Sequence, residues 1–338
     1  MSRVGKPDGD SESPSENGGL VCAYLRPAGG AWRQVGWQAV RDWTPEQGLL
    51  WVHLDRVRPD SRRFITEQSG IDAIVQEALL AEETRPRAMA VGDSLLLILR
   101  GVNLNPGADP EDMVSIRLWV EPGRVISTRH RRLVAIDDLR QRMAGGGGPE
   151  TAGDLVVAVA AGLIERMSAV IEALDDEEDA LEAQVVEEQH RAIRTELGRI
   201  RRQAIMLRRF LAPQREALSR LQGEELGWLD SKRKARLREV TDRVIRYVED
   251  LDAIRERAAV IQDELMNRLS DQMNRNMYLL TIVATVMLPL GFFTGLLGVN
   301  VDGIPGTENA PWAFAVVCAL LGLLVALEIW ILRRLRWF

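Results

Sequence analysis

Two long uncharged stretches near the C-terminus constrain this chain more than any other feature. They cover residues 276–301 and 309–327, and neither contains Asp, Glu, Lys or Arg. A helix of about 20 apolar residues crosses the ~30 Å hydrocarbon core of a bilayer. Lipid offers no hydrogen-bond partner to an open backbone, so each stretch is expected to be helical. The sequence therefore predicts transmembrane helices at 277–297 and 311–332, joined by a loop at 298–310.

The charges that flank the two spans predict how this hairpin is oriented. Arg268 and Arg275 precede the first span, and three arginines lie in the tail 333–338. The loop has no Lys or Arg but carries Asp302 and Glu308. Positive residues are retained on the cytoplasmic side of a membrane. We therefore expect a multi-pass protein of the cell inner (cytoplasmic) membrane, with both termini and the basic tail in the cytoplasm and the loop outside.

The remaining composition excludes several classes of protein. The formal net charge is −6, which does not suggest a nucleic-acid partner. Residues 1–19 are rich in Ser, Glu, Pro and Gly and lack the apolar core of a signal peptide, so they are predicted to be a disordered N-terminus. Cys22 and Cys318 are the only cysteines, and their separation predicts neither a disulfide nor a zinc ribbon.

Residues 20–143 are predicted to form one cytoplasmic α+β domain with a small mixed sheet. Residues 59–81 and 133–143 have the apolar spacing of helices. Favoured turn residues, Gly92-Asp93 and Glu121-Pro122-Gly123, separate pairs of strand-like runs. The strand-like runs are 20–25, 48–55, 87–91, 94–102, 114–120 and 124–128.

Residues 150–276 are predicted to form long cytoplasmic helices, a stalk between that domain and the membrane. The first, about 154–190, is acidic, and the second, about 191–222, contains nine arginines. The third starts near Leu229, and apolar residues recur along it at steps of three or four, as in a packed helix seam. No Pro or Gly interrupts 228–288, so the third helix is expected to continue into the first span.

The acidic run Asp175–Asp179 in the first helix allows two interpretations. Its carboxylates could form ion pairs with the arginines of the second helix if the two pack antiparallel. Alternatively, they could form a cytoplasmic binding surface for divalent cations, which prefer oxygen ligands.

Two spans cannot enclose a pore, so any conduction requires a homo-oligomer with one span per subunit lining the axis. The first span is the candidate, because small or polar residues recur along one side of it. The same spacing also suits plain helix–helix packing in a membrane. The stripe consists of Asn274, Met277, Thr281, Ala284, Leu288, Gly291 and Gly295.

The tripeptide Gly298-Val299-Asn300 ends the first span on the outer side. It could be a turn in which Gly caps the helix. It could instead be a selectivity filter, in which a ring of Asn oxygens binds a divalent cation transiently through its water shell. Asp302 and Glu308 would then attract cations to the mouth, and Asp302 is a weak candidate for direct contact with the metal.

These features together resemble the CorA superfamily of metal-ion transporters. That family ends its first span in Gly-Met-Asn, and the Gly298-Val299-Asn300 variant is similar to its ZntB (zinc transporter) branch. RGVNLNPGADPEDMVSIRLWV (100–120), VISTRH (125–130), GLLWVHLD (48–55) and TRPR (84–87) also resemble the cytoplasmic domain of that branch.

The resemblance implies a funnel-shaped homopentamer in the lipid bilayer and Zn²⁺ transport coupled to protons. Mg²⁺ or Co²⁺ flux is the nearest alternative, and the ion is cargo rather than a resident cofactor. By position, Gly298, Val299 and Asn300 would form the outer filter. Five stripe residues would face the pore: Asn274, Met277, Thr281, Leu288 and Gly291.

Two other classes of protein are the alternatives to a transporter. A membrane-anchored coiled-coil sensor or scaffold is compatible with the long third helix, whereas the sequence contains no P-loop, HExxH or nucleophile–base pattern of an enzyme. His53, His130 and His190 all lie in the predicted soluble part, which argues against a tightly binding zinc site in the spans.

Overall fold

The computed structural model describes residues 18–184, 190–298 and 312–334. The chain divides into two compact units, Met1–Gln262 and Asp263–Phe338, called here the first and second units. The boundary lies within one helix, α7 (Ser231–Leu297), which contributes residues to both units.

A seven-stranded mixed sheet forms the centre of the first unit, with the strand order β2-β1-β3-β7-β6-β5-β4. Only the pair β3–β7 is parallel, and the other neighbours are antiparallel. Gly92 adopts a positive φ of 60° in the turn between β4 and β5, as the Gly-Asp turn predicted. The strands are β1 (Leu20–Arg26), β2 (Arg33–Val35), β3 (Leu49–Asp55), β4 (Arg87–Val91), β5 (Ser94–Gly101), β6 (Val114–Val120) and β7 (Arg124–Arg129).

Each face of the sheet is covered by apolar residues of helices, because residues alternate between the two faces along a strand. On one face, Leu50 and Ile126 belong to a core shared with the short helices near the N-terminus. On the other, Trp51 and Val125 belong to a larger core shared with the long helices. The short helices are α1 (Trp37–Arg41), the 3₁₀ turn η1 (Pro45–Gln47), α2 (Pro59–Arg63), the π turn η2 (Phe64–Gln68) and α3 (Ala73–Leu80). A further helix, α4 (Val134–Ala144), belongs to the larger core.

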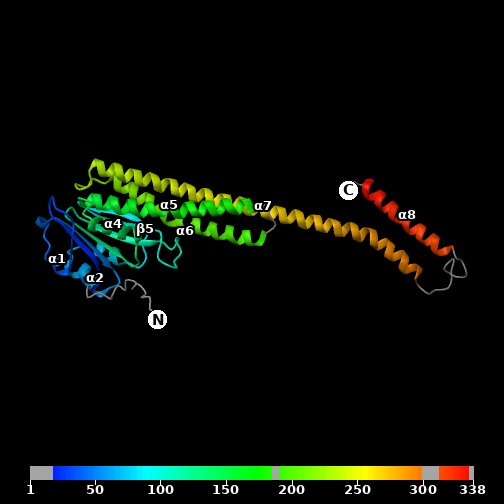
Figure 1. Ribbon diagram of the computed structural model, residues 1–338, viewed down its shortest axis with the longest axis horizontal. Helices are drawn as coiled ribbons and strands as arrows, with labels where there is room; N and C mark the ends of the chain where they lie inside the picture. The colour runs from blue at the N-terminus through cyan, green and yellow to red at the C-terminus, as the bar shows by residue number, and fades with distance from the viewer. Residues whose placement is uncertain (1–17, 185–189, 299–311, 335–338) are drawn as a thin grey trace, which may run out of the picture. The chain divides into compact units, whose positions relative to one another are not determined.

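Three long helices follow the sheet, as predicted, and α5 and α6 lie side by side (Figure 1). They are α5 (Ala152–Gln184), α6 (His190–Gly223), which continues through Pro213, and α7. The apolar seam predicted along α7, from Leu237 to Leu269, is buried as far as Leu265, but Leu269 is 38 % exposed. Since this seam joins the core of the sheet as far as Ile254, its partners there lie in its own chain.

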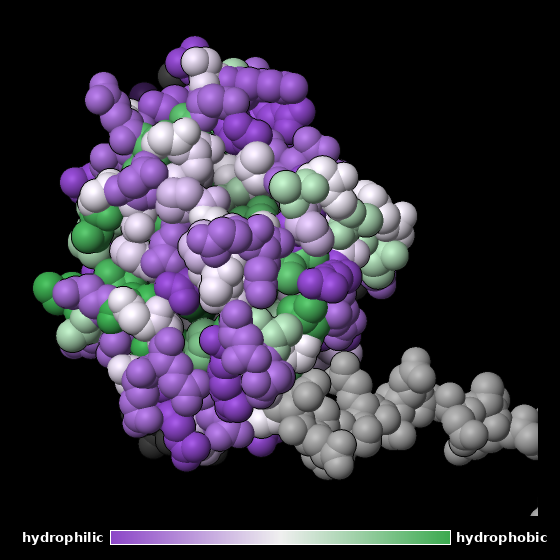
Figure 2. Space-filling view, turned by 90° about the vertical axis from the view of Figure 1, so that its left-hand side faces the viewer, coloured by the Kyte–Doolittle hydropathy of each residue, from purple (hydrophilic) through white to green (hydrophobic). Residues whose placement is uncertain are grey.

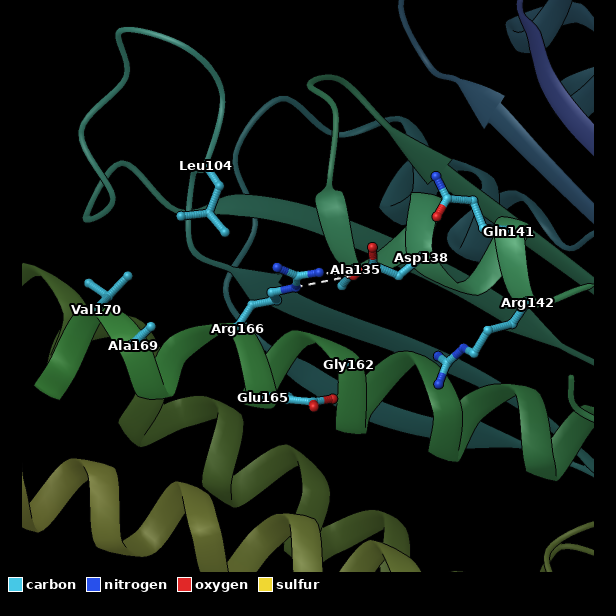
Figure 3. Close-up of a pocket in the computed structure, with 10 residues that line it drawn as sticks. All are labelled: Leu104, Ala135, Asp138, Gln141, Arg142, Gly162, Glu165, Arg166, Ala169 and Val170. Atoms are coloured by element: carbon cyan, nitrogen blue, oxygen red, sulfur yellow. Dashed lines mark hydrogen bonds and ion pairs between the residues drawn. The ribbon is translucent and has the colours of Figure 1, made fainter.

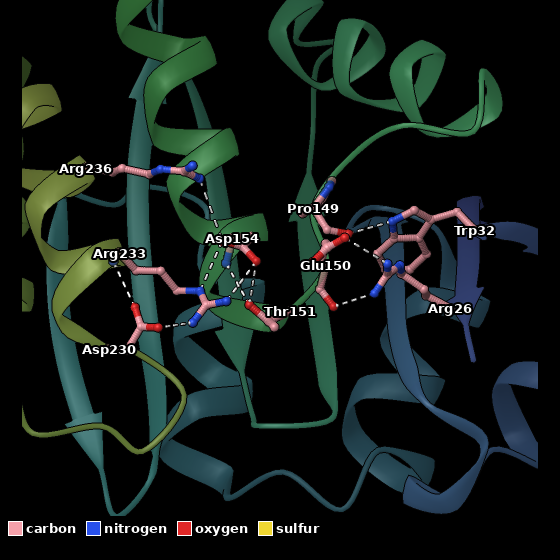
Figure 4. Close-up of polar contacts among 9 residues, drawn as sticks. All are labelled: Arg26, Trp32, Pro149, Glu150, Thr151, Asp154, Asp230, Arg233 and Arg236. Carbon is pink, nitrogen blue, oxygen red and sulfur yellow. Dashed lines mark hydrogen bonds and ion pairs between the residues drawn. The ribbon is translucent and has the colours of Figure 1, made fainter. Parts of the chain in front are cut away.

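A polar cluster fixes where α5 and α7 begin (Figure 4). Thr151 accepts a hydrogen bond from the Asp154 amide at 3.2 Å, and Arg233 of α7 binds the Asp154 carboxylate. A Cβ on Gly153 would lie 2.7 Å from the Trp228 carbonyl oxygen, so a larger side chain would push the two helix starts apart. Just upstream, the Trp32 indole donates to the Pro149 carbonyl at 2.8 Å, which ties this segment to the sheet.

One face of the first unit differs in character from the C-terminal helices. The face in Figure 2 is mostly hydrophilic, with small separate apolar areas among its charged and polar side chains. In contrast, residues 276–297 of α7 and the helix α8 (Ala313–Arg334) are apolar and mostly exposed, and both are long enough to cross a membrane. The two predicted spans are therefore two helices, and α8 begins and ends close to the predicted bounds 311–332.

Candidate ion pathway

The predicted pore stripe is a continuous exposed line on the last part of α7. Its members alternate at steps of three and four residues, an average of 3.5. A straight α-helix has 3.6 residues per turn, so such a line drifts slowly and stays on one side over three heptads. The structure places all seven predicted residues on this helix, and all are exposed within a single chain: Asn274, Met277, Thr281, Ala284, Leu288, Gly291 and Gly295.

The hydroxyl of Thr281, one of the two polar side chains of the stripe, is bonded within the helix. Thr281 donates its hydroxyl hydrogen to the Met277 carbonyl at 2.8 Å, which leaves the oxygen lone pairs free to accept from water. Pro289 has no amide, so the Thr285 carbonyl lacks the usual helical donor four residues later. A Cβ on Gly291 or Gly295 would meet nothing within 4 Å, so both glycines present open backbone. The stripe can therefore face a hydrated ion or a neighbouring helix.

Gly298 lies where α7 ends. Its amide donates to the carbonyls of Thr294 at 3.1 Å and of Gly295 at 3.2 Å, which closes the last turn. The carbonyl end of a helix carries partial negative charge, which favours cations nearby. The other residues predicted for the filter and the mouth lie outside the described residues: Val299, Asn300, Asp302 and Glu308.

The acidic run Asp175–Asp179 is engaged mainly by α7. One of its members, Glu177, forms an ion pair with Arg199 of α6. Arg257 of α7, in contrast, forms ion pairs with Asp175, Glu178 and Asp179. Pairing of α5 with the arginines of α6 therefore accounts for only part of the run. The sequence contained no signal for Arg257, which lies far from the run along the chain.

The structure gives no support to a metal site at the acidic run or at the histidines. Within residues 18–184, 190–298 and 312–334, no group of three or more His, Cys, Asp or Glu side chains could hold a metal ion. His53 is fully buried, and its Nδ1 lies 2.8 Å from the Ser127 hydroxyl. Burial, with Arg129 and Arg140 nearby, holds the pKa of His53 well below its ordinary value, so the ring is neutral. His130 is exposed.

Both cysteines are free, as expected. Cys22 is buried in the sheet, and burial raises the pKa of its thiol to about 11. Cys318 is exposed on α8.

A groove of about 800 Å³ lies between α4 and α5 in the first unit (Figure 3). Arg166 of α5 donates through Nε to Asp138 of α4 at 3.1 Å across it. Its lining contains none of the predicted site residues, so the groove is separate from the stripe. The lining residues are Leu104, Ala135, Asp138, Gln141, Arg142, Gly162, Glu165, Arg166, Ala169 and Val170.

Comparison with known proteins decides the family. The family model described as "CorA-like Mg2+ transporter protein" matches residues 46–334. This chain belongs to the CorA-like transporter family. It is therefore a membrane transporter by family and not an enzyme, as the sequence predicted.

Two relatives place this CorA-like chain within the family. It is 42 % identical over 331 residues to the divalent cation transporter CmaX of Pseudomonas aeruginosa, covering 96 % of this chain and 98 % of that protein. It is 37 % identical over 322 residues to the zinc transport protein ZntB of Pectobacterium carotovorum subsp. carotovorum, covering 95 % of this chain and 97 % of that one. The resemblance to the ZntB branch is confirmed, and CmaX is a further relative of this chain.

A solved structure supports the fold. The structure of full-length CmaX matches with a TM-score of 0.83 at 39 % identity, over 96 % of this chain and 100 % of that one. The predicted fold class, an α+β domain followed by long helices and two apolar C-terminal helices, is confirmed.

Proposed function

We propose that this protein transports divalent metal ions across the inner membrane through a pore lined by α7, with Zn²⁺ as its principal cargo. The observation that carries the proposal is the stripe from Asn274 to Gly295, whose seven residues are all exposed within a single chain. In a homo-oligomer, one stripe from each subunit would line a common axis. Family resemblance favours a pentamer, with both termini in the cytoplasm.

The composition of the stripe suits an ion that keeps its water. Asn274 and Thr281 offer neutral oxygens. Met277, 57 % exposed, would form an apolar ring between them, and Leu288, 74 % exposed, would form another beyond Thr281. Polar rings of this kind hold hydrated cations weakly, and apolar constrictions close a pore by excluding water. Weak sites favour passage, because an ion that binds tightly leaves slowly.

The outer filter is proposed to be Gly298-Val299-Asn300, with Asn300 as the residue that contacts the hydrated ion. Asp302 and Glu308 would concentrate cations at the mouth, since clustered negative charge raises the local cation concentration. The helix end at Gly298 supports this, because the carbonyl end of α7 favours positive charge near it.

The choice of zinc over magnesium or cobalt follows the relatives, since ZntB is a zinc transport protein and CmaX a divalent cation transporter. Coupling to protons is part of the proposal. Flux of Zn²⁺, Mg²⁺ and Co²⁺ into proteoliposomes, each with and without a pH gradient, tests both parts.

We expect zinc flux that increases with the pH gradient and falls at least tenfold in Asn300→Ala. Asn309→Ala, at the start of the second uncharged stretch, is the matched control and should keep native flux. Absence of flux for every ion at every gradient would instead support a membrane-anchored sensor or scaffold. Equal flux in the Asn300 and Asn309 variants would remove Asn300 from the filter.

A further inference from the structure

The buried carboxylate of Glu178 stands apart from the other acidic residues of α5. Its side chain is 0 % exposed, whereas those of Asp175 and Asp179 are 47 % and 60 % exposed. Arg257 is the cation that faces it, with Nη2 at 3.2 Å from Glu178 Oε2. Within the described chain neither carboxylate oxygen of Glu178 has a hydrogen bond of good geometry. A buried carboxylate with so few partners is costly in its ionised form.

Arg257 cannot neutralise this cluster. Its Nη1 donates to Asp179 at 3.1 Å, and its Nη2 also binds Asp175. Three carboxylates therefore share one guanidinium, and Glu182 adds negative charge from the same helix. From α7, Asp250 also faces this cluster, and its pKa is raised by burial and then by the charge of Asp175. From α6, Arg199 is already paired with Glu177 and Glu196.

We propose that Glu178 is a proton-binding site that controls how firmly the end of α5 is held against α7. With Glu178 protonated, the cluster has two carboxylates around Arg257, and the buried group is neutral. With Glu178 ionised, a third charge lies in a site closed to water, and it reaches water only if α5 and α7 separate there. Because burial and the neighbouring carboxylates outweigh Arg257, the pKa of Glu178 is raised to about 7, within the range of cytoplasmic pH.

The contact between Glu178 and Arg257 involves the helix that carries the proposed pore. Arg257 belongs to the same helix as the stripe from Asn274 to Gly295. A proton on Glu178 therefore acts on the helix that carries the proposed pore. The inference goes beyond the proposed function, because the state of the α5–α7 contact is measured without any ion flux.

The test measures the separation of α5 and α7 in the full-length protein in detergent. Spin labels are placed at the exposed positions Ala183 and Val260, with Cys22 and Cys318 replaced by alanine and labelled chains diluted into unlabelled ones. Between about pH 6 and about pH 8, the distance distribution should widen, with a midpoint near 7. Glu178→Gln should keep the narrow distribution at both pH values, because its side chain stays neutral.

Two further variants make the test decisive. Asp176→Asn removes an exposed carboxylate from the same turn and should keep the native transition. Arg257→Gln removes the cation and should move the midpoint upward by about one pH unit, even if Glu178→Gln fails to fold. A distribution that does not change with pH, or a transition that persists in Glu178→Gln, would overturn the inference. A chain that shows the transition but transports no ion would overturn only the proposed function.

Discussion

Arg233 of α7 donates from Nε and Nη2 to the two carboxylate oxygens of Asp154 on α5, each at 3.0 Å. The two side chains are 20 % and 18 % exposed, so this bidentate pair is largely shielded from water. It joins two residues far apart in sequence, at the level where both helices begin (Figure 4). Shielded bidentate pairs are stronger and more specific in geometry than surface ion pairs.

Asp154→Ala is expected to destabilise the first unit by about 1–3 kcal/mol, because it leaves the Arg233 guanidinium largely buried without its main partner. The midpoint of thermal unfolding, followed by tryptophan fluorescence, should fall by several degrees. Arg236→Ala is the control, since Arg236 lies 3.9 Å from the same carboxylate and is 56 % exposed, and its loss should cost less than about 0.5 kcal/mol. Equal effects of the two variants would contradict this account.

Thr281→Ala is expected to reduce ion flux about fivefold, whereas Thr285→Ala should stay within about twofold of native flux. Both hydroxyls donate to the carbonyl four residues earlier, at 2.8 Å and 2.7 Å, so removing either has a similar effect on the helix. Only Thr281 lies on the stripe. Initial rates in proteoliposomes at matched protein content measure the difference, and an equal loss in both variants would show that the stripe has no special role.

Gly291→Leu is expected to lower flux more than tenfold without changing the thermal unfolding of the first unit. Within one chain a Cβ at Gly291 meets nothing within 4 Å, so any effect must come from the pathway or from a neighbouring subunit. Gly322→Leu on α8 is equally open within the chain and should keep most of the flux. Native transport by the Gly291 variant would place that residue against lipid instead.

His53 is expected to make the first unit sensitive to acid. The folded state keeps this ring neutral, while the unfolded state takes up a proton below about pH 6.5, so stability falls as the pH drops. The loss is up to about 1.4 kcal/mol for each pH unit. Glu178 acts in the opposite direction, because its raised pKa favours the folded state at low pH, and this advantage is lost as the pH rises through about 7.

The comparison that isolates His53 is His53→Phe against the native chain, both with Glu178 present. The difference in unfolding midpoint between the two proteins should be smaller at about pH 5 than at about pH 7, or should change sign. Parallel curves for the two proteins would mean that His53 is not the acid-sensitive group. The phenylalanine keeps an aromatic ring beside Trp51, whose ring centre lies 5.9 Å from that of His53.

Local patterns predicted the elements well and the long-range contacts poorly. Alternating apolar residues and turn residues identified six of the strands, but not β2, whose three residues carry no strand signal. The parallel pairing of β3 with β7 joins segments far apart in sequence, which local spacing does not specify. Local patterns also failed to identify the main ion-pair partner of the run Asp175–Asp179. Pairing with α6 was one prediction for this run, whereas its main cation is Arg257 of α7.

By itself, the sequence determined the two spans, their predicted orientation and the stripe on α7. These depend on the length of apolar runs, on flanking charge and on helical period, all of which are local properties of a chain. Only the tertiary structure decided that Glu178, of five consecutive acidic residues, is the one closed to water, and that Asp154 and Arg233 hold two helix starts together. Burial and pairing depend on how helices pack, and a difference of one position on a helix turns a side chain by about 100°.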